Sequence, residues 1–409
     1  MEENKIPMYQ RKDFSEFGDF MLITGTLCNM HCRHCGQEPV RDKVCLVNPK
    51  VSDKMWQLME HYVESTMRLP LINGWYPHHI YFYGGEALLY WDLIKEIVEK
   101  IHAKTDFLKT SGFRFGIQSN GVLLTQDKVD FCNKYELEFG FSYDAPYPWA
   151  VRDYISDDIV NLVRKIKKYT ITASCNGINY DYLLIHRCLK AKFPESSRFR
   201  IMPNLTRCFE MDKDIYTYPW DKIRVALHKL CIGAQLDDAF CLDWLSDYVK
   251  KLLSQERYDA PEKVFRCLTN PREIAFAPTG EFYSCHNSNQ FLGDLNDSWD
   301  TLKERKYALA KTLVSPECMT CQHVDICKSY CPLNLREKDN SFVTCHDFLW
   351  PLYTIVKEEI KQLEKPLTQE DIEWYYKEEE IMKQQVHDFL NEGKRYAVEQ
   401  TRFPKISGN

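Results

Sequence analysis

The stretch Cys28-Asn-Met-His-Cys32-Arg-His-Cys35-Gly36 places three cysteines in one short loop, directly after the apolar run from Phe20 to Leu27. Thiolates at this spacing converge on one small inorganic core only where the backbone wraps tightly around it. Three cysteines leave one iron of a cubane iron–sulfur cluster without a protein ligand, and that open iron can bind a substrate or cofactor. A zinc ion with His31 or His34 as its fourth ligand, or three unconnected buried cysteines, are the alternatives. The spacing favours the cluster.

The composition is that of a large metal-binding protein from a reducing compartment. The 409 residues predict two or three domains, and the 44% of hydrophobic residues can build a sizeable core. Seventeen cysteines, an odd number gathered in clusters, favour metal sites over a disulfide scaffold. Because the N-terminal residues MEENKIPMYQ lack the basic and apolar segments of a signal peptide, we expect a cytoplasmic protein.

Two classes of partner are disfavoured by the same composition. No run of about 18 apolar residues occurs, so a membrane span is not expected. The net charge of −6 argues against nucleic acid as an obligatory partner.

Between residues 19 and 204, short β-rich runs alternate with segments of helical periodicity. The predicted strands are Phe20–Gly25, His79–Tyr83, Phe113–Gln118, Leu137–Ser142, Thr170–Cys175 and Arg198–Met202. The predicted helices between them are Asp53–Arg68, Trp91–Leu108, Gln126–Tyr135, Asp157–Lys168 and Tyr180–Lys192. Strands that alternate with helices form parallel sheets. Six such units predict an α/β fold, an open, partial (β/α)6 TIM-like barrel with its ligands at the carboxyl ends of the strands.

The rest of the chain divides into four segments. Residues 1–18 are predicted to be an N-terminal extension, residues 205–258 a helical bridge, residues 259–350 a cysteine-rich domain with a small β-hairpin, and residues 351–409 charged helices. The helices predicted in these segments are Pro219–Ile232, Phe240–Leu253, Pro351–Lys365 and Thr368–Lys394.

Glycine and polar residues follow the predicted strands at the edge where a ligand would lie. The candidate ligand-binding residues are Gly84, Gly85, Glu86, Ser119, Asn120, Ser142, Asn176 and Met202. Taken singly, each segment is an ordinary turn or, at Met202, an apolar core position. Five such segments follow consecutive predicted strands, and their meaning depends on the resemblance described below.

Seven further cysteines form a second array in the C-terminal half of the chain. They are Cys267, Cys285, Cys318, Cys321, Cys327, Cys331 and Cys345. Two metal centres are the simplest interpretation, either two zinc sites or two iron–sulfur clusters. The remaining cysteines are expected to be buried small hydrophobes, and Cys208 and Cys241 are the only ones considered as extra ligands.

The first loop, with the ring of His34 between its second and third cysteines, resembles the Cys-x3-Cys-x-Φ-Cys signature of the radical S-adenosylmethionine (SAM) enzymes. The strand-end segments are similar to the GGE, Q-T-N-G, S-x-D-G-P and V-N-x-x-N motifs of that family, although Ala145 replaces the glycine of the third. The resemblance implies a [4Fe–4S] cluster on the three thiolates, with SAM chelated by the open iron. Reductive cleavage of SAM would yield a 5′-deoxyadenosyl radical that removes hydrogen from the substrate.

The same resemblance implies roles for the strand-end residues. The glycine backbone and Glu86 would hold the SAM ammonium, and Ser142 would contact the SAM carboxylate. Either Arg152 or Arg164 would supply the cation that pairs with this carboxylate. Met202 would lie beside the adenine.

The second cysteine array resembles the SPASM domain, the auxiliary-cluster module of many radical SAM peptide and protein maturases. The segment from Ile274 to His286 looks like the hairpin of that domain. The resemblance implies two auxiliary [4Fe–4S] clusters, and therefore three clusters in total. The outer cluster would take Cys318, Cys321, Cys327 and Cys345, and the inner one Cys267, Cys285 and Cys331.

The inner auxiliary cluster lacks an evident fourth thiolate. We therefore expect an open iron, or a non-thiolate or distant ligand. His286 stands where sulfatase-maturing members of the family carry an aspartate that acts as base. Because a histidine can act as a base, His286 is the candidate catalytic residue.

These resemblances predict a radical SAM oxidoreductase that modifies a peptide or protein, by a crosslink, a thioether or an epimerisation such as ribosomal-peptide maturases make. Formylglycine synthesis by anaerobic sulfatase maturation ranks second, since His286 departs from the expected aspartate. Radical chemistry on a small metabolite or nucleotide ranks third. A non-enzymatic zinc or iron–sulfur scaffold is the competing class, and the GGE and Ser142 matches count against it.

Three partners are expected for such an enzyme. They are the peptide or protein substrate, an electron donor of the flavodoxin or ferredoxin type and a leader-recognition protein. Only 27 residues precede Cys28, too few for an N-terminal peptide-recognition domain, so a leader would need a separate partner or another groove.

Overall fold

The computed structural model describes residues 20–35, 50–66, 78–104, 113–196, 198–203, 215, 217–244, 274–286, 290–313, 350–363 and 365–400. Several predictions fall outside these residues. They include the extension at residues 1–18, the part of the helix Phe240–Leu253 after residue 244, and Cys45, Cys208, Cys267, Cys318, Cys321, Cys327, Cys331 and Cys345.

A nine-stranded sheet organises the fold, in the order β6-β5-β4-β3-β2-β1-β7-β8-β9. Its strands are β1 (Phe20–Gly25), β2 (His78–Gly84), β3 (Phe113–Ser119), β4 (Glu138–Ser142), β5 (Tyr169–Cys175), β6 (Phe199–Pro203), β7 (Ala275–Phe276), β8 (Glu281–Tyr283) and β9 (Phe291–Asp294). Strands β1 to β6 are parallel and follow one another in chain order. In the described part of the chain the sheet does not close on itself, so the predicted open, partial TIM-like α/β fold is confirmed.

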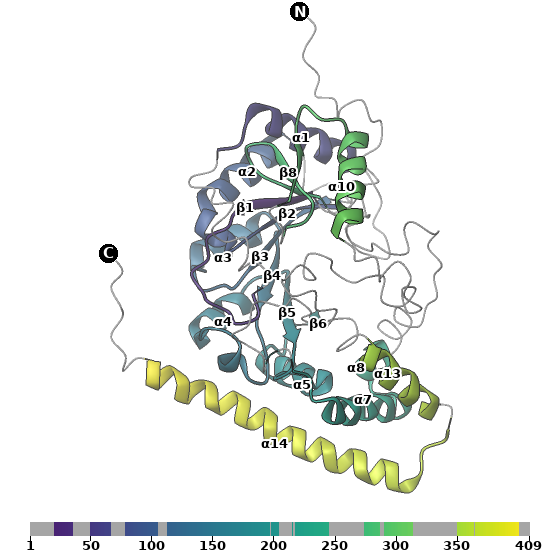
Figure 1. The fold of residues 1–409 in the computed structure, drawn as a ribbon. Helices are drawn as coiled ribbons and strands as arrows, with labels where there is room; N and C mark the ends of the chain where they lie inside the picture. The colour runs from purple at the N-terminus through teal and green to yellow at the C-terminus, as the bar shows by residue number, and fades with distance from the viewer. Residues whose placement is uncertain are drawn as a thin grey trace, which may run out of the picture.

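Helices cover one side of this sheet and its β6 end (Figure 1). Those between the parallel strands are α1 (Asp53–Thr66), the 3-10 helix η3 (Ala87–Tyr90), α2 (Trp91–Lys104), α3 (Gln126–Lys134), the 3-10 helix η5 (Pro148–Ala150), α4 (Asp157–Arg164) and α5 (Tyr182–Lys192). The later ones are α7 (Trp220–Gln235), α8 (Ala239–Trp244), α10 (Trp299–Leu313), α13 (Trp350–Leu363) and α14 (Gln369–Gln400). In Figure 1, α7, α8, α13 and α14 gather at the lower end, near β6, and α10 lies beside β8.

The two faces of the sheet differ because successive side chains of a strand point to opposite sides. In β2, Ile80 and Phe82 are fully buried and belong to the hydrophobic core. His79, Tyr81 and Tyr83 alternate with them and are only half-buried. Strand register places the following polar residues on the same face as Tyr81: Arg114, Gln118, Glu138, Ser142, Thr172 and Ser174. The barrel therefore has an apolar outer face under the helices and a polar inner face.

All six predicted barrel strands are present, with ends that differ from the prediction by at most one residue. Two helices show why their ends lie where they do. The side chain of Ser156 accepts a hydrogen bond from the Ile159 N–H at the start of α4. In the same way, Asp181 caps α5 through the Leu184 N–H, so this helix begins two residues later than predicted.

The hairpin predicted within residues 274–286 is an extension of the barrel sheet. Strand β7 pairs in parallel with β1, with Met21 opposite Ala275 and Leu22 opposite Phe276. The ring of Phe276 stacks on that of Phe20, with centroids 3.9 Å apart. Strands β8 and β9 continue the sheet in antiparallel pairing. The cysteine-rich segment is thus joined to the barrel through backbone hydrogen bonds.

Helix α14 is anchored on α5 and α7 by apolar and charged side chains. Tyr375, Met382 and Phe389 are buried on one of its faces. Arg187 of α5 donates to Glu379 of α14 at 3.1 Å. No described helix, α14 included, is long and apolar enough to cross a membrane.

We expect Met382→Ala to lower the free energy of unfolding by about 2–5 kcal/mol, because it opens a cavity under α14. Met382 is 1% exposed, whereas its neighbour Ile381 is 44% exposed. Ile381→Ala is the matched control and should change stability by no more than about 0.5 kcal/mol. Urea unfolding measures both values. Equal losses in the two variants would show that α14 is not packed on the barrel through this face.

Candidate active site

The three cysteines lie in the loop that leaves the carboxyl end of β1. The N–H of Cys35 donates to the carbonyl of Cys32 at 3.1 Å, which tightens the loop. The backbone N–H of Arg33 donates to the carbonyl of Val151 at 2.9 Å, and its guanidinium donates to the carbonyl of Ala150 at 2.7 Å. The cysteine loop is therefore held against the connection between β4 and α4.

Gly84, the last residue of β2, and Gly85 after it allow this strand end to lie directly on the chain that enters the cysteine loop. The N–H of Gly85 donates to the carbonyl of Gly25 at 3.0 Å. A Cβ atom on Gly85 would lie 2.3 Å from the carbonyl oxygen of Thr26 and 2.4 Å from that of Leu27. A Cβ atom on Gly84 would lie 2.2 Å from the carbonyl oxygen of Gly25. Only glycine fits at both positions, because backbone meets backbone there.

The carboxylate of Glu86 ties the ends of β2 and β3 together. It is buried, and its Oε1 accepts from the Leu88 N–H at 2.8 Å and from the Ser119 hydroxyl at 2.7 Å. Its Oε2 accepts from the Asn120 N–H at 2.8 Å. Burial raises the pKa of Glu86, while these three hydrogen bonds act in the opposite direction. A contact between Glu86 and the SAM ammonium stays a prediction, because the carboxylate already has protein partners on both oxygens.

The side chain of Asn120 reaches from β3 to the cysteine loop. Its Oδ1 accepts from the Val122 N–H at 2.9 Å, which turns its amide N–H groups toward the loop. There Nδ2 donates to Oδ1 of Asn29 at 2.9 Å and lies 3.9 Å from Sγ of Cys28. Three predicted site residues, Glu86, Ser119 and Asn120, are thus brought together beside the first cysteine.

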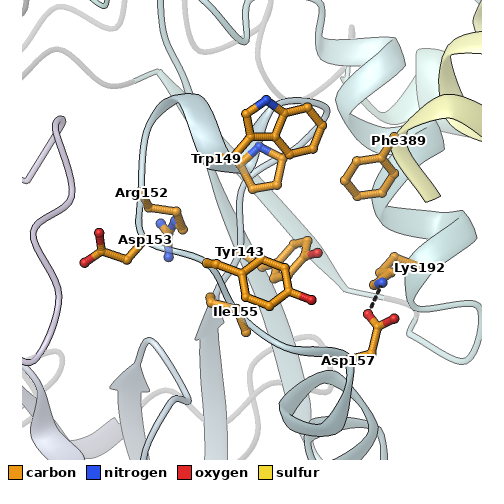
Figure 2. Close-up of a pocket in the computed structure, with 10 residues that line it drawn as sticks. Tyr143, Trp149, Arg152, Asp153, Ile155, Asp157, Lys192 and Phe389 are labelled. Atoms are coloured by element: carbon orange, nitrogen blue, oxygen red, sulfur yellow. Dashed lines mark hydrogen bonds and ion pairs between the residues drawn. The ribbon is translucent and has the colours of Figure 1, made fainter. Parts of the chain in front are cut away.

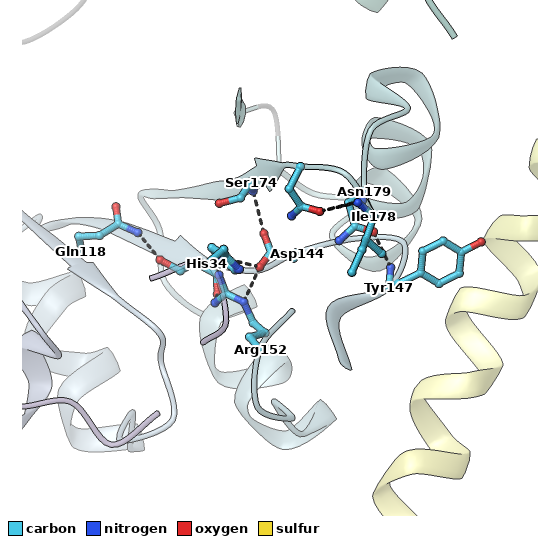
Figure 3. A network of polar contacts seen from close by, with 10 residues as sticks. His34, Gln118, Asp144, Tyr147, Arg152, Ser174, Ile178 and Asn179 are labelled. Carbon is cyan, nitrogen blue, oxygen red and sulfur yellow. Dashed lines mark hydrogen bonds and ion pairs between the residues drawn. The ribbon is translucent and has the colours of Figure 1, made fainter. Parts of the chain in front are cut away.

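A buried charge network lies at the carboxyl end of β4 (Figure 3). Asp144 accepts from Nε of Arg152 at 2.6 Å and from the N–H of Ser174 at 2.7 Å. Its carboxylate also lies 3.5 Å from Nε2 of His34. Nη1 of Arg152 donates to the carbonyl of Ser142 at 2.6 Å. Burial alone would raise the pKa of Asp144, but the nearby Arg152 and His34 hold it below its usual value.

Of the two cations considered for the SAM carboxylate, Arg152 is the one beside the cysteine loop. Burial raises the pKa of Cys32 to about 12; the positive charge of Arg152 lowers it, and Cys35 and Cys28 raise it. The three thiols and this guanidinium are therefore electrostatic neighbours. Arg164 instead pairs with Glu195 at the surface.

At the carboxyl end of β5, the buried side-chain amides of Asn176 and Asn179 have N–H groups with no acceptor among the described residues. Oδ1 of Asn176 accepts from the N–H groups of Ile178 at 2.9 Å and Asn179 at 3.0 Å. Oδ1 of Asn179 accepts from the N–H of Tyr147 at 3.1 Å. These bonds fix the direction of both Nδ2 groups, which are buried and have no hydrogen-bond partner in the described part of the chain. An unpaired buried donor costs about 1–3 kcal/mol, so these two amides fit an acceptor-rich ligand.

Cys285 and His286 follow β8, and His286 contacts the end of β2. The ring of His286 contacts that of Tyr83, the residue before the paired glycines, with centroids 4.3 Å apart. Burial raises the pKa of Tyr83, and negative charge on Cys35 and Cys285 adds to this effect. Tyr83 therefore lies close to Cys35 of the predicted SAM-binding cluster and to Cys285 of the predicted inner auxiliary cluster.

The described residues fit SAM and the cluster that would bind it; of the auxiliary-cluster cysteines only Cys285 lies among them. Three neighbouring thiols with an adjacent amide and guanidinium suit an anionic iron–sulfur cluster. The amides of Asn176 and Asn179 suit the carboxylate, ribose and adenine acceptors of SAM. Among the described residues, no three His, Cys, Asp or Glu side chains are grouped so as to hold a single metal ion.

Two further features border this edge of the sheet. Met202 lies in β6 opposite Ser174 of β5. A small cavity opens between the β4–α4 connection and α14, where Trp149 faces Phe389 and Arg152 lines one wall (Figure 2).

Four residues of the network were not among the sequence-based site residues. Gln118, Asp144 and Asn179 lie inside the segments that are similar to the Q-T-N-G, S-x-D-G-P and V-N-x-x-N motifs, so the motifs could have indicated them. Tyr83 carried no signal of its own, because its contact with His286 joins segments two hundred residues apart in the chain.

Comparison with known proteins agrees with this geometry. Residues 22–183 match the radical SAM superfamily, so the chain carries a radical SAM domain over this range. Over 372 residues the chain is 21% identical to the radical SAM cyclopropyl synthase TigE of Paramaledivibacter caminithermalis. The aligned region covers 86% of this chain and 75% of TigE.

Solved structures share the fold at lower sequence identity. Native anSMEcpe with bound AdoMet superposes with a TM-score of 0.59 at 15% identity, over 85% of this chain and 100% of that one. Native anSMEcpe with bound AdoMet and Cp18Cys peptide gives a TM-score of 0.57 at 14% identity, over 85% of this chain and 99% of that one.

Proposed function

We propose that this protein is a radical SAM enzyme that oxidatively modifies a peptide or protein substrate. One observation carries the proposal. The Cys28–Cys35 loop, inside the radical SAM domain, is enclosed by Asn120, Arg152 and the Gly84–Gly85 turn at the carboxyl edge of the sheet. A [4Fe–4S] cluster bound by these thiols would supply the electron that cleaves SAM into methionine and a hydrogen-abstracting radical.

The protein's own residues bind and orient the reactants. Cys28, Cys32 and Cys35 would hold three irons and leave the fourth open. Asn176 and Asn179 offer SAM two buried donors that have no acceptor in the described residues. The polar inner face of the barrel faces the space in which the substrate would be held close to the reacting atom and away from water.

A peptide substrate is supported by one comparison and by the position of His286. One structural neighbour binds AdoMet together with a peptide. His286, which follows Cys285, contacts Tyr83 near the end of β2. We assign Cys285 to the inner auxiliary cluster of a SPASM-type module, with Cys267 and Cys331, and His286 to the role of base. An external flavodoxin- or ferredoxin-type donor would supply electrons.

The first step of the proposal is tested with protein purified without oxygen. With dithionite and SAM, we expect 5′-deoxyadenosine and methionine, and about twelve irons per chain if all three clusters are present. Mass spectrometry and metal analysis measure these quantities. Stoichiometric zinc, no iron and no 5′-deoxyadenosine would refute radical chemistry and support a non-enzymatic zinc-binding scaffold.

The substrate class is tested by reading the genes that flank this one. A short reading frame with a repeated core supplies a peptide, whose mass should change on incubation with enzyme and SAM. A neighbouring sulfatase gene would instead favour sulfatase maturation. Conversion of the active-site residue of that sulfatase to formylglycine by this enzyme would then replace the peptide-crosslinking hypothesis. Turnover of a small metabolite or nucleotide, with no change in any peptide, would contradict the peptide assignment.

A further inference from the structure

We propose that Gln118, held in place by Tyr81, is a positioning residue that makes the hydroxyl of Ser142 a hydrogen-bond donor to the carboxylate of SAM. The inference rests on the proposed function, because it requires SAM to bind at the carboxyl end of β4. It concerns how this chain prepares that end of the sheet before SAM arrives.

Three side chains on the inner face form a row across three strands. The hydroxyl of Tyr81, in β2, donates to Oε1 of Gln118, in β3, at 3.2 Å. Nε2 of Gln118 then donates to Oγ of Ser142, in β4, at 2.7 Å, as Figure 3 shows. Because Oε1 is taken by Tyr81, the amide of Gln118 presents its N–H group to the serine.

The consequence for Ser142 follows from the chemistry of a hydroxyl. A serine hydroxyl has one hydrogen to donate and two lone pairs that accept. When Oγ accepts from Gln118, its own hydrogen must point away from that amide. Among the described residues Oγ has no second partner. The hydroxyl hydrogen is therefore available to an acceptor beyond the end of β4, where Arg152 lies against the carbonyl of the same serine.

Two glycines in mid-strand make room for the row. A Cβ atom on Gly116 would lie 2.3 Å from the ring of Tyr81. One on Gly140 would lie 2.4 Å from Oε1 of Gln118 and 2.7 Å from the hydroxyl oxygen of Tyr81. Register places Gly116 opposite Tyr81 and Gly140 opposite Gln118. Glycine in the interior of a strand weakens the strand. Its presence at both positions therefore indicates that they accommodate the close approach of Tyr81 and Gln118.

The test is a double-mutant cycle on SAM affinity in the reconstituted holoenzyme, measured without oxygen by isothermal titration calorimetry. A hydrogen bond to a charged group is worth about 10- to 100-fold in affinity, so Ser142→Ala should weaken SAM binding by this factor. Gln118→Met keeps the length of the side chain and removes its polarity, and we expect a similar loss. In the Ser142→Ala background, Gln118→Met should cause no further loss, because Gln118 acts through the serine.

Two further variants keep the proposal falsifiable. Tyr81→Phe removes the donor that orients Gln118 and should give a smaller loss of SAM affinity that also disappears in the Ser142→Ala background. In Gln118→Glu the carboxylate can only accept a hydrogen bond, so it should accept the hydrogen of the Ser142 hydroxyl. This variant should therefore bind SAM more weakly than Gln118→Met. Iron content and melting temperature equal to those of the unmodified protein establish that a variant is folded.

The outcomes separate this inference from the proposed function. Additive losses in the cycle, or unchanged SAM affinity in Gln118→Met, would overturn the role of Gln118 while SAM binding stands. Failure of the unmodified holoenzyme to bind SAM would overturn the proposed function itself, and the inference with it.

Discussion

Replacing Cys32 by alanine is expected to reduce cleavage of SAM to the level of the protein-free reaction. Cys32 is the central cysteine of the loop, and Arg152, Cys35 and Cys28 all act on its pKa. With two thiolates left, the loop would no longer hold three irons, and SAM would have no open iron to bind. Production of 5′-deoxyadenosine under dithionite measures the loss.

Metal analysis gives this prediction an independent readout. With the three proposed clusters bound, Cys32→Ala should lose about four of about twelve irons per chain, because the two proposed auxiliary clusters would not depend on this loop. Cys132→Ala is the matched control, since Cys132 is buried in α3 against the core. It should retain the full iron content and SAM cleavage. Cleavage that persists in Cys32→Ala would refute the assignment of the loop.

Removing the carboxylate of Asp144 should be the most destabilising single change at the site. Asp144→Ala leaves the guanidinium of Arg152 buried without its counter-charge, and the side chains are 0% and 5% exposed. Breaking a buried pair in this way costs about 3–5 kcal/mol. The free energy of urea unfolding should fall by this amount. SAM affinity should fall as well, because Arg152 and the carbonyl of Ser142 would lose their fixed positions.

A second arginine–carboxylate pair of the same domain provides the control. Arg164 and Glu195 are joined at the surface, with side chains 35% and 55% exposed. Because solvent screens such a pair, Glu195→Ala should cost no more than about 1 kcal/mol and leave SAM affinity unchanged. Equal destabilisation by Asp144→Ala and Glu195→Ala would show that burial does not strengthen the Asp144–Arg152 pair.

The barrel was predictable because its signals are local. Each strand is a short apolar run, and each helix repeats apolar residues with a period near 3.6, as Ile94, Ile97, Val98 and Ile101 do in α2. The pairing of β7 with β1 was not predictable in this way. It depends on two residues of each strand and on the stacking of Phe20 with Phe276, whose positions in the chain are unrelated by any period. Helix α10 was also not foreseen from the sequence.

At the site, sequence motifs located the strand ends but could not assign each side chain its partner. Glu86 was predicted to hold the SAM ammonium, which stays a prediction; the structure adds its bonds to Ser119 and to the backbone of Asn120, which no motif indicated. The choice between Arg152 and Arg164 needed the fold, because only tertiary structure distinguishes a buried guanidinium from an exposed one. The mid-strand glycines Gly116 and Gly140 carry meaning only once their cross-strand neighbours are known.

The junction between β1 and β7 limits how this protein could be divided or recombined. In a chain cut between the barrel and the cysteine-rich segment, β1 would become a bare edge strand with the ring of Phe20 uncovered, a surface that promotes aggregation. Exchange of the C-terminal segment between relatives would face the same constraint. The incoming segment must bring a strand that pairs with Met21 and Leu22 and a ring that replaces Phe276. The two halves are therefore expected to be inherited as one unit.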